Sequence, residues 1–469
     1  MNSKAPDTEH EFVYSMGIES FRKKAITEIM NQYNFLCYVE NGNDGKRYTE
    51  DLRHAWSHTG DISAKDFVIH LNDVLNKPKL NTLNVLGLIP QEKLFDLYTA
   101  FRETNIVKSA YNDILQKRLT ETSELYSADS SAVCVSVFEV NRNMYLLCTK
   151  SIEYDRLWYI AEFYGIDLDL FESGLAPFPA SKTEAKKILG LMDKTDGSIA
   201  HGAPVTGKPA AFEGPGSDSP EGAAKVYLEG LRSANLKQMV SAFAIESYVR
   251  NYDLEANLNR FGAYFFSTYD IKFPNANDIV TTMNISNRRA IVTDRLISQC
   301  SLLYAFESGL FSSAIESQDQ SNEIEAGVGE QFTRLIEILN PTKLSTMKIL
   351  GYIPLEKLNE LSLVFQSSSY TENYLESNQD FFTKYAKIYG ADNMIGCIAA
   401  FEIDGNLTLL FYDAIEYSGK WYIYDLSGSL GSYMLLPSST YGLAPLSIFE
   451  DDADAYKDKI LELVSPIEY

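Results

Sequence analysis

The pattern of apolar and polar positions in the first half of the chain returns in the second half. Residues 80–94 correspond to residues 344–358 at an offset of 344 − 80 = 264, with 9 of 15 positions identical. Residues 138–160 return without a gap as residues 401–423, at 401 − 138 = 263, with 11 of 23 identical. The pattern predicts a tandem duplication.

We therefore expect three parts. Repeat one covers 1–193 and repeat two covers 219–469. Between them, 194–218 is rich in Gly, Pro, Ser and Ala and has no period, which is typical of a flexible linker.

Helical spacing marks the opening of repeat two. Ser219 is suited to an N-cap, Pro220 to the first helical position and Glu221 to the positive helix end. Apolar residues then recur at i, i+3, i+4 and i+7 in two runs: Ala224, Tyr227, Leu228 and Leu231, and Leu236, Met239, Val240 and Phe243. This spacing predicts two amphipathic helices. Nothing in repeat one corresponds to about 219–265, so we expect repeat one to lack its opening helices.

Both repeats then follow one plan of helices and a short extended piece. We expect one helix to end near Tyr38 or Ala305, and the next to run into Asn76 or Asn340. The Leu-Gly-x-Ile-Pro piece follows, and its proline excludes a continuous helix or central strand. In repeat two a further helix is expected to end at Gly390, a suitable C-cap.

The period then changes to that of strands. Residues 394–403 and 407–417 flank Asp404-Gly405, a strong hairpin signal, and Ser418-Gly419 leads into a third strand at 421–424. In repeat one the first turn is Asn141-Arg142, which is weaker turn chemistry. Both repeats close with a helix, expected at 185–191 and 453–464. The fold class predicted is α+β.

Several motifs resemble a group of Firmicutes proteins with tandem nuclear transport factor 2-like (ketosteroid-isomerase-like) cones. They are residues 219–231, 242–248, 389–392, 401–405, 420–422 and 442–445. The resemblance implies two cone-like repeats, in each of which a curved antiparallel sheet wraps helices and leaves a pocket at its open end. It also implies a group without an assigned activity, whose members are frequently exported or lipid-anchored.

Charge and apolar content narrow the possible partners. The net charge of −23 and the pI of about 4.7 exclude nucleic acid and anionic membranes as expected partners. No apolar run approaches the ~18 residues of a transmembrane helix. As the sequence stands, without a leader, the expected compartment is the cytoplasm, and export or lipid anchoring is the alternative if the N-terminus is truncated.

Candidate chemistry is sparse. Isomerases of this superfamily use a carboxylate base in an apolar pocket, so the recurring strand carboxylates are candidates: Glu139 with Glu402, and Glu153 with Glu416. The alternative is that they face solvent or pair with Lys or Arg. His54 and His58 stand at i, i+4 but have no glutamate between them, so we expect no metal site there. The five cysteines show no Cys-x-x-Cys spacing, and Cys134 and Cys397, which hold the same place in the two repeats, are expected to be small buried hydrophobes.

Two functions stay open. The first is a non-catalytic module that binds a small molecule or a protein, without a cofactor. The second is an isomerase or dehydratase with a strand carboxylate in an apolar pocket. A buried glutamate beside an aromatic donor favours the enzyme, and a filled interior favours the binding module. We also expect that the repeats pair with each other or that the chain forms a homodimer.

Overall fold

Two compact units make up the chain in the computed structural model, one of residues 25–208 and one that contains residues 209–469. The structure describes residues 29, 36, 83–101, 106–140, 142–162, 174–178, 182–194, 213–261, 278–307, 344–364, 374–403, 405–426, 442–446 and 453–467.

Repeat one is built on an antiparallel sheet in the order β4-β3-β2-β1-β6, with β5 paired to β3. Its strands are β1 (Asn84–Ile89), β2 (Ser130–Val140), β3 (Asn143–Tyr154), β4 (Leu157–Glu162), β5 (Leu175–Pro177) and β6 (Asp193–Lys194). Its helices are η3 (Gln91–Lys93), α4 (Leu94–Phe101), α5 (Lys108–Leu125) and α6 (Lys182–Leu191).

Repeat two carries the same sheet in the order β10-β9-β8-β7, with β11 paired to β9. Its strands are β7 (Lys348–Tyr352), β8 (Asn393–Ile403), β9 (Asn406–Tyr417), β10 (Lys420–Asp425) and β11 (Leu443–Pro445). Its helices are α7 (Pro220–Arg232), α8 (Leu236–Ser241), α9 (Glu246–Asn251), α10 (Leu254–Phe261), α11 (Asp278–Glu307), η5 (Leu355–Lys357), α15 (Leu358–Val364), α16 (Tyr374–Ile388) and α18 (Ala453–Leu463).

The register of the two sheets confirms the predicted fold of two cone-like repeats. Cys134 pairs with Thr149 in repeat one, and Cys397 pairs with Tyr412 in repeat two, each at an offset of 263. Both short first strands carry an irregularity one residue before the repeated glycine, between Val85 and Gly87 and between Ile349 and Gly351. The weak Asn-Arg turn also forms a hairpin.

The opening of repeat two follows its sequence signals closely. The Ser219 hydroxyl oxygen accepts a hydrogen bond from the backbone N–H of Gly222 at 3.1 Å, and Pro220 begins α7. The second predicted helix is shorter than its apolar spacing indicates, because α8 ends at Ser241. Beyond it the backbone of Ala242 and Ala244 bonds to Ile423 of β10, so Phe243 lies in extended chain beside the sheet.

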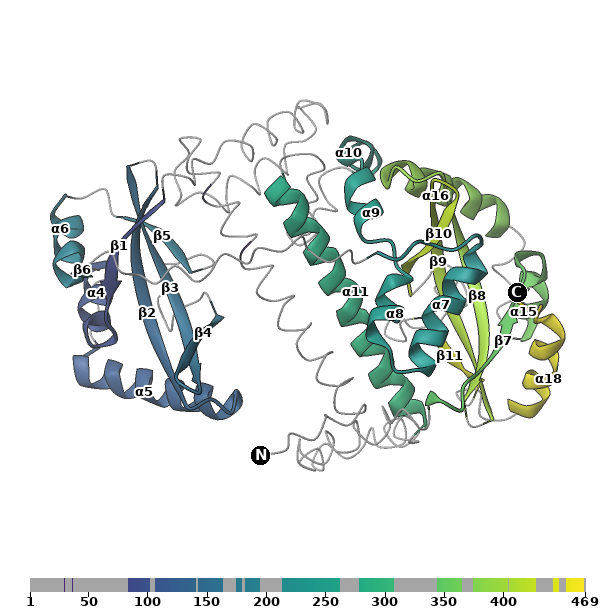
Figure 1. The fold of residues 1–469 in the computed structure, drawn as a ribbon, viewed down its shortest axis with the longest axis horizontal. Helices are drawn as coiled ribbons and strands as arrows, with labels where there is room; N and C mark the ends of the chain where they lie inside the picture. Colours follow the sequence, from purple (N-terminus) through teal and green to yellow (C-terminus); the bar gives the residue numbers. More distant parts are fainter. Residues whose placement is uncertain are drawn as a thin grey trace. The chain divides into compact units, whose positions relative to one another are not determined.

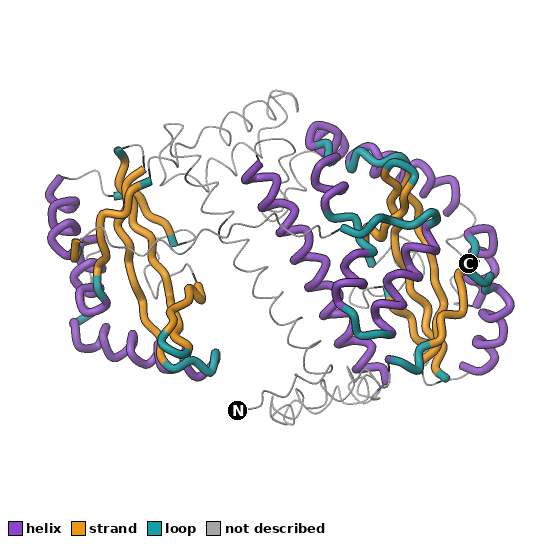
Figure 2. The backbone as a smooth tube through the Cα atoms, viewed as in Figure 1, coloured by secondary structure: helices purple, strands orange, loops and turns teal. Residues whose placement is uncertain are grey.

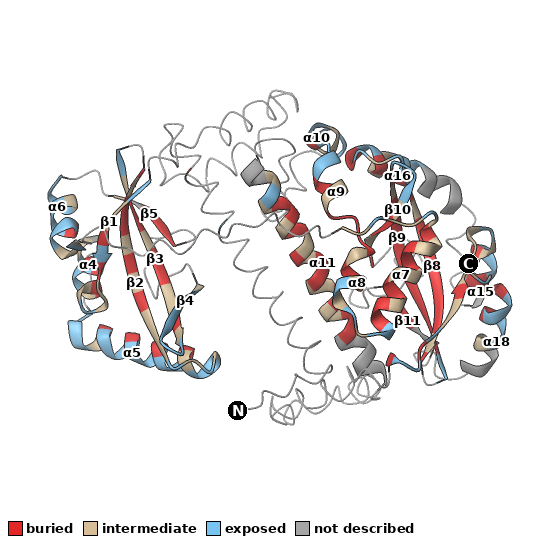
Figure 3. Ribbon diagram, viewed as in Figure 1, coloured by how far each residue is buried: buried red, intermediate tan, exposed pale blue. Residues whose placement is uncertain are grey.

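Helices cover both faces of the sheet in repeat two. In Figure 1, α7, α8 and α11 lie on one face, and α15 and α18 lie on the other. Figure 2 shows the strands as a curved layer between these two groups. The central strands are almost entirely buried in Figure 3, as expected for a sheet with two covered faces.

The core beneath α15 and α18 is aliphatic. Phe411, Leu409 and Ile398 of the sheet pack against Leu361 of α15 and Ile460 of α18, and all five are nearly inaccessible to solvent. On the other face, α7 buries Tyr227, Leu228 and Leu231. The interior of repeat two is therefore filled by side chains over most of the sheet.

Several expectations fall on residues that the structure does not describe. These are the helices ending near Tyr38 and Asn76 or Asn340, residues 195–212 of the predicted linker, Asp404, Asn141, His54 and His58. The expected C-cap at Gly390 forms: its N–H donates to the carbonyl of Lys387, at φ +55°. In the described part of the chain, no helix is long and apolar enough to span a bilayer.

Candidate functional site

Repeat two contains a pocket of about 280 Å³ at the end of strand β7, where β8 continues without β7 beside it. Strand β7 ends at Tyr352, and the next residue makes one further bond, from its N–H to the carbonyl of Ile398 at 3.0 Å. Beyond this point β8 is flanked by β9 on one side and by the pocket on the other. The lining residues are Glu221, Tyr352, Ile353, Pro354, Leu355, Glu356, Ile395, Gly396, Cys397, Ile398 and Tyr412.

The chain leaves the sheet here for local reasons. Pro354 has no N–H to donate to a strand neighbour, and it precedes the short helix η5. On the other edge of β7, Tyr352 and Ser465 exchange two backbone hydrogen bonds of 2.9 and 2.8 Å. A side chain on Gly351 would clash with the Ser465 carbonyl, so glycine is needed for this close approach. The C-terminal segment thus holds Tyr352 at the pocket.

The buried inner end of the pocket includes Tyr412 and Cys397. They are direct partners on neighbouring strands, so their side chains lie on the same face of the sheet. The Tyr412 hydroxyl donates to the backbone carbonyl of Pro220 at 3.2 Å. This bond ties the first residue of α7 to the sheet and places Glu221, the next residue, at the pocket.

Burial and nearby negative charge keep these two groups protonated. The pKa of the Cys397 thiol is raised well above its usual value, mainly by loss of solvation and further by the Glu221 carboxylate. The pKa of Tyr412 is also raised, first by burial and then by Cys397 and Glu221. The inner end therefore offers a neutral thiol and a phenol that is already hydrogen bonded.

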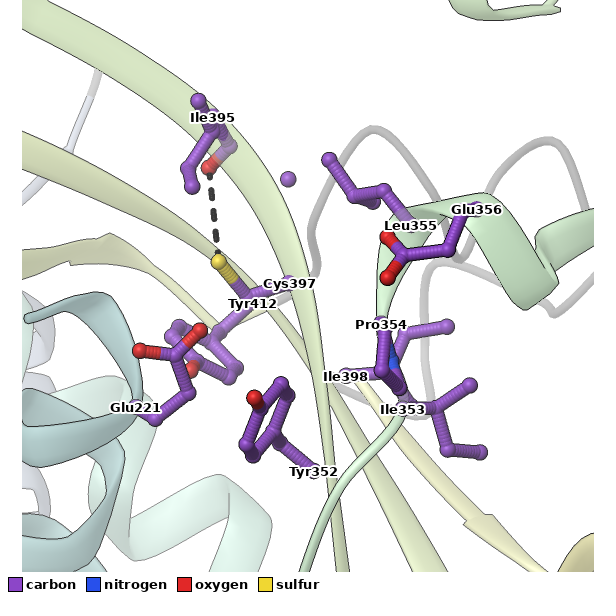
Figure 4. A pocket seen from close by; sticks show the side chains of 11 residues that line it. Glu221, Tyr352, Ile353, Pro354, Leu355, Glu356, Ile395, Cys397, Ile398 and Tyr412 are labelled. Carbon is purple, nitrogen blue, oxygen red and sulfur yellow. Dashed lines mark hydrogen bonds between the residues drawn. The ribbon is translucent and has the colours of Figure 1, made fainter. Parts of the chain in front are cut away.

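The outer part of the pocket is more accessible. Glu356 on η5 is exposed, while Tyr352 and Ile395 are half-buried. In Figure 4, Glu221 lies on one side of strand β8 and Glu356 on the other, with Tyr352 below them. Of the described residues that line this pocket, none is Lys, Arg or His. The side-chain charge at the pocket is therefore negative.

Repeat one shows which of these groups are particular to repeat two. Leu88 stands at the place of Tyr352, and Thr149 at the place of Tyr412. Gln91 replaces Leu355, and its side-chain oxygen accepts from the backbone N–H of Val133 at 3.3 Å. Glu221 belongs to the segment that has no counterpart in repeat one. Glu221, Tyr352 and Tyr412 are therefore particular to repeat two, whereas Glu356 has a counterpart in Glu92.

None of the strand carboxylates singled out from the sequence lines this pocket. The Glu153 carboxylate accepts from the Ser130 hydroxyl at 2.6 Å. Glu402 lies 3.8 Å from the Lys457 ammonium, with 19% of its side chain exposed. Glu139 and Glu416 are half-buried within their strands. Of these four, Glu402 matches the alternative of a carboxylate paired with Lys or Arg.

Metal chemistry has no candidate among the described residues, where no group of three or more His, Cys, Asp or Glu could hold an ion. The four described cysteines are free. Burial raises the pKa of Cys148 and of Cys300 to about 12. Cys397 is buried as expected, whereas Cys134 is only partly buried.

Sequence reasoning missed Glu221 and Tyr412 as site residues. Glu221 was interpreted only as a favourable charge at the start of a helix. The available signal was the difference between the repeats, since Tyr412 aligns with Thr149 and Tyr352 aligns with Leu88. A position that is polar or aromatic in one copy only is a candidate for a function that the other copy lacks.

No family model and no curated protein sequence matches the chain. Among solved structures, a cystatin-like protein from Ruminococcus gnavus ATCC 29149 aligns over 98% of this chain and 96% of its own. Its sequence identity is 12% and its TM-score is 0.45.

Proposed function

We propose that repeat two is a non-catalytic module that binds a small molecule in the pocket beside β8. The observation that carries the proposal is the pocket itself: it is built on a sheet shared by both repeats, yet its Glu221, Tyr352 and Tyr412 groups occur in repeat two only. Its volume of about 280 Å³ is close to the lower end of the range for small-molecule sites. This proposal keeps the resemblance of the repeats to nuclear transport factor 2-like cones.

The state of the inner groups favours binding over catalysis. A thiol with a raised pKa is a poor nucleophile, because the thiolate is the reactive form. The Tyr412 proton is engaged by a backbone carbonyl. A general acid must release a proton and a general base must accept one near neutral pH, and the protonated Cys397 and Tyr412 side chains do neither readily.

The test is a thermal-shift screen of small molecules on the full chain, with a pocket-filling variant. Ile395→Trp places an indole in the pocket, and Ala132→Trp makes the matched change in repeat one. A ligand at about 100 times its Kd adds about 2.7 kcal/mol of stability to the folded state. We expect hits to raise the Tm of the wild type and of Ala132→Trp, and to leave Ile395→Trp unchanged.

Two results would contradict the proposal. One is a set of hits that stabilise Ile395→Trp as much as the wild type, which would place binding elsewhere. The other is the absence of any stabilising compound from a screen that spans cations, anions and neutral molecules.

A further inference from the structure

The negative charge of the pocket determines whether a cationic or an anionic ligand can bind. Glu221 and Glu356 are its ionisable carboxylates, and no cationic side chain is among the described lining residues. Glu221 is half-buried, which reduces its screening by solvent, whereas Glu356 stands exposed at the mouth. An anionic ligand would be repelled from both, and a cation would be attracted by both.

The apolar walls of the pocket determine which uncharged group of a ligand can pack there. Tyr352 and Ile395 are half-buried at its sides, and Leu355 adds a further apolar surface. These side chains suit a short aliphatic group, and the Tyr352 ring also offers a face to a cation. A strongly hydrated inorganic ion would leave this apolar surface unused.

A backbone donor at the pocket supplies a third element. In repeat one, the N–H of Val133 points away from β3 and donates to the side-chain oxygen of Gln91 at 3.3 Å. Gly396 occupies the same register position in β8, so its N–H points to the same place beside the strand. There, Leu355 replaces the glutamine and has no acceptor. The Gly396 N–H thus faces the pocket without the side-chain acceptor that repeat one provides.

We propose that the ligand is a small primary amine with an aliphatic side chain and a neighbouring amide carbonyl, the chemistry of an amino-acid amide or a peptide N-terminus. Its ammonium group lies against Glu221, Glu356 at the mouth adds to the attraction, and its carbonyl oxygen accepts from the Gly396 N–H. The aliphatic group packs against Tyr352 and Ile395. This inference rests on the proposed function, since it names the chemical class that the pocket takes.

Isothermal titration calorimetry on the full chain tests the contribution of each chemical group of the ligand with a separate probe. The measurement is made at about pH 6.5, where an α-amine is protonated. Leucinamide carries the charge, the aliphatic group and the carbonyl. N-acetylleucinamide lacks the charge, and 3-methylbutylamine lacks the carbonyl. We expect leucinamide to bind about tenfold more tightly than either, and its affinity to fall as salt is added.

Variants assign the contacts to residues. Glu221→Gln and Glu356→Gln should each weaken leucinamide binding about fivefold, with the larger loss at Glu221 because it is less exposed. Leu355→Gln should weaken it also, because the new side chain can accept from Gly396 as Gln91 does from Val133. The matched changes in repeat one, Glu92→Gln and Gln91→Leu, should leave binding unchanged. Melting curves of each variant check that it is folded.

The outcomes separate this inference from the proposed function. Equal affinity for leucinamide and N-acetylleucinamide would overturn the inference, as would unchanged binding in both glutamate variants. The inference also fails if leucinamide does not bind while other compounds bind and are blocked by Ile395→Trp. In that last case the pocket remains a binding site for a different class, and the proposed function stands.

Discussion

The strands β4 and β10 share the sequence Trp-Tyr-Ile but have opposite environments. In β10, Tyr422 is 7% exposed and Ile423 is fully buried. In β4, the corresponding Tyr159 and Ile160 are 50% and 53% exposed. Figure 3 shows β4 as an exposed strand at the end of its sheet.

The difference comes from the segment 213–245. Ser217 exchanges backbone hydrogen bonds of 2.9 and 2.8 Å with Trp421, and Ile423 bonds to Ala242 and Ala244. Helix α7 packs on the face of the same strand. In repeat one, no described element pairs with the outer edge of β4. The same residues therefore form a strand in both repeats, but among the described residues only β10 has a neighbour that buries it.

The largest expected effect of this difference is on stability. Ile423→Ala removes a fully buried side chain and should destabilise repeat two by about 3 kcal/mol, whereas Ile160→Ala should change repeat one by less than about 0.5 kcal/mol. Urea unfolding of the full chain, followed by hydrogen exchange in β9 and β3, reports on each repeat. Equal losses in the two variants would mean that β4 is covered in solution.

An intermediate effect is expected at high pH. Because the pKa of Cys397 is raised in the folded protein, the unfolded chain loses its thiol proton first as the pH rises through about 9. The stabilising contribution is therefore complete below about pH 9, and above it stability falls by up to about 1.4 kcal/mol per pH unit. Cys397→Val should reduce this fall in repeat two.

The matched thiol sharpens the comparison. Burial also raises the pKa of Cys134, but this residue is only partly buried, so Cys134→Val should flatten the alkaline profile of repeat one less. Urea midpoints measured across the alkaline range provide the readout. A profile for Cys397→Val identical to that of the wild type would show that this thiol does not control the alkaline loss.

The smallest expected effect lies in the second hairpin turn. Asp155 and Arg156 hold φ values of +51° and +67° in repeat one, where Ser418 and Gly419 hold +53° and +74° in repeat two. Glycine adopts these values without the steric cost of a Cβ. Arg156→Gly should stabilise repeat one by about 0.5–1 kcal/mol, and Gly419→Arg should destabilise repeat two by a similar amount. Thermal melts of both variants test the pair, and shifts of the same sign would contradict it.

Much of the fold could be predicted because its signals are local. The cap at Ser219, the prolines after the first strands and the glycine turns each act within a few residues, so they are readable without a partner. The length of α8 was not readable, because Phe243 fits a helical stripe equally well. Backbone bonds from the two flanking alanines to Ile423, about 180 residues away, decide that it is extended.

The candidate site was not predicted for the same reason. Glu221, Gly396 and Tyr352 are far apart in the chain and carry no motif spacing. They meet because the Tyr412 hydroxyl holds the start of α7 and because Ser465 pairs with the end of β7. The strand carboxylates were candidates because they recur in both repeats. Their recurrence follows from the duplicated fold and does not indicate a function.

By itself, the sequence determined that one α+β plan is written twice, with the order of its strands, turns and caps. The tertiary structure alone decided which copies of the same residues are buried and where a pocket opens. The physical reason is the separation along the chain over which each interaction acts. Propensity and turn chemistry act between neighbours in the chain, whereas burial and the pairing of strand edges depend on segments that only folding brings together.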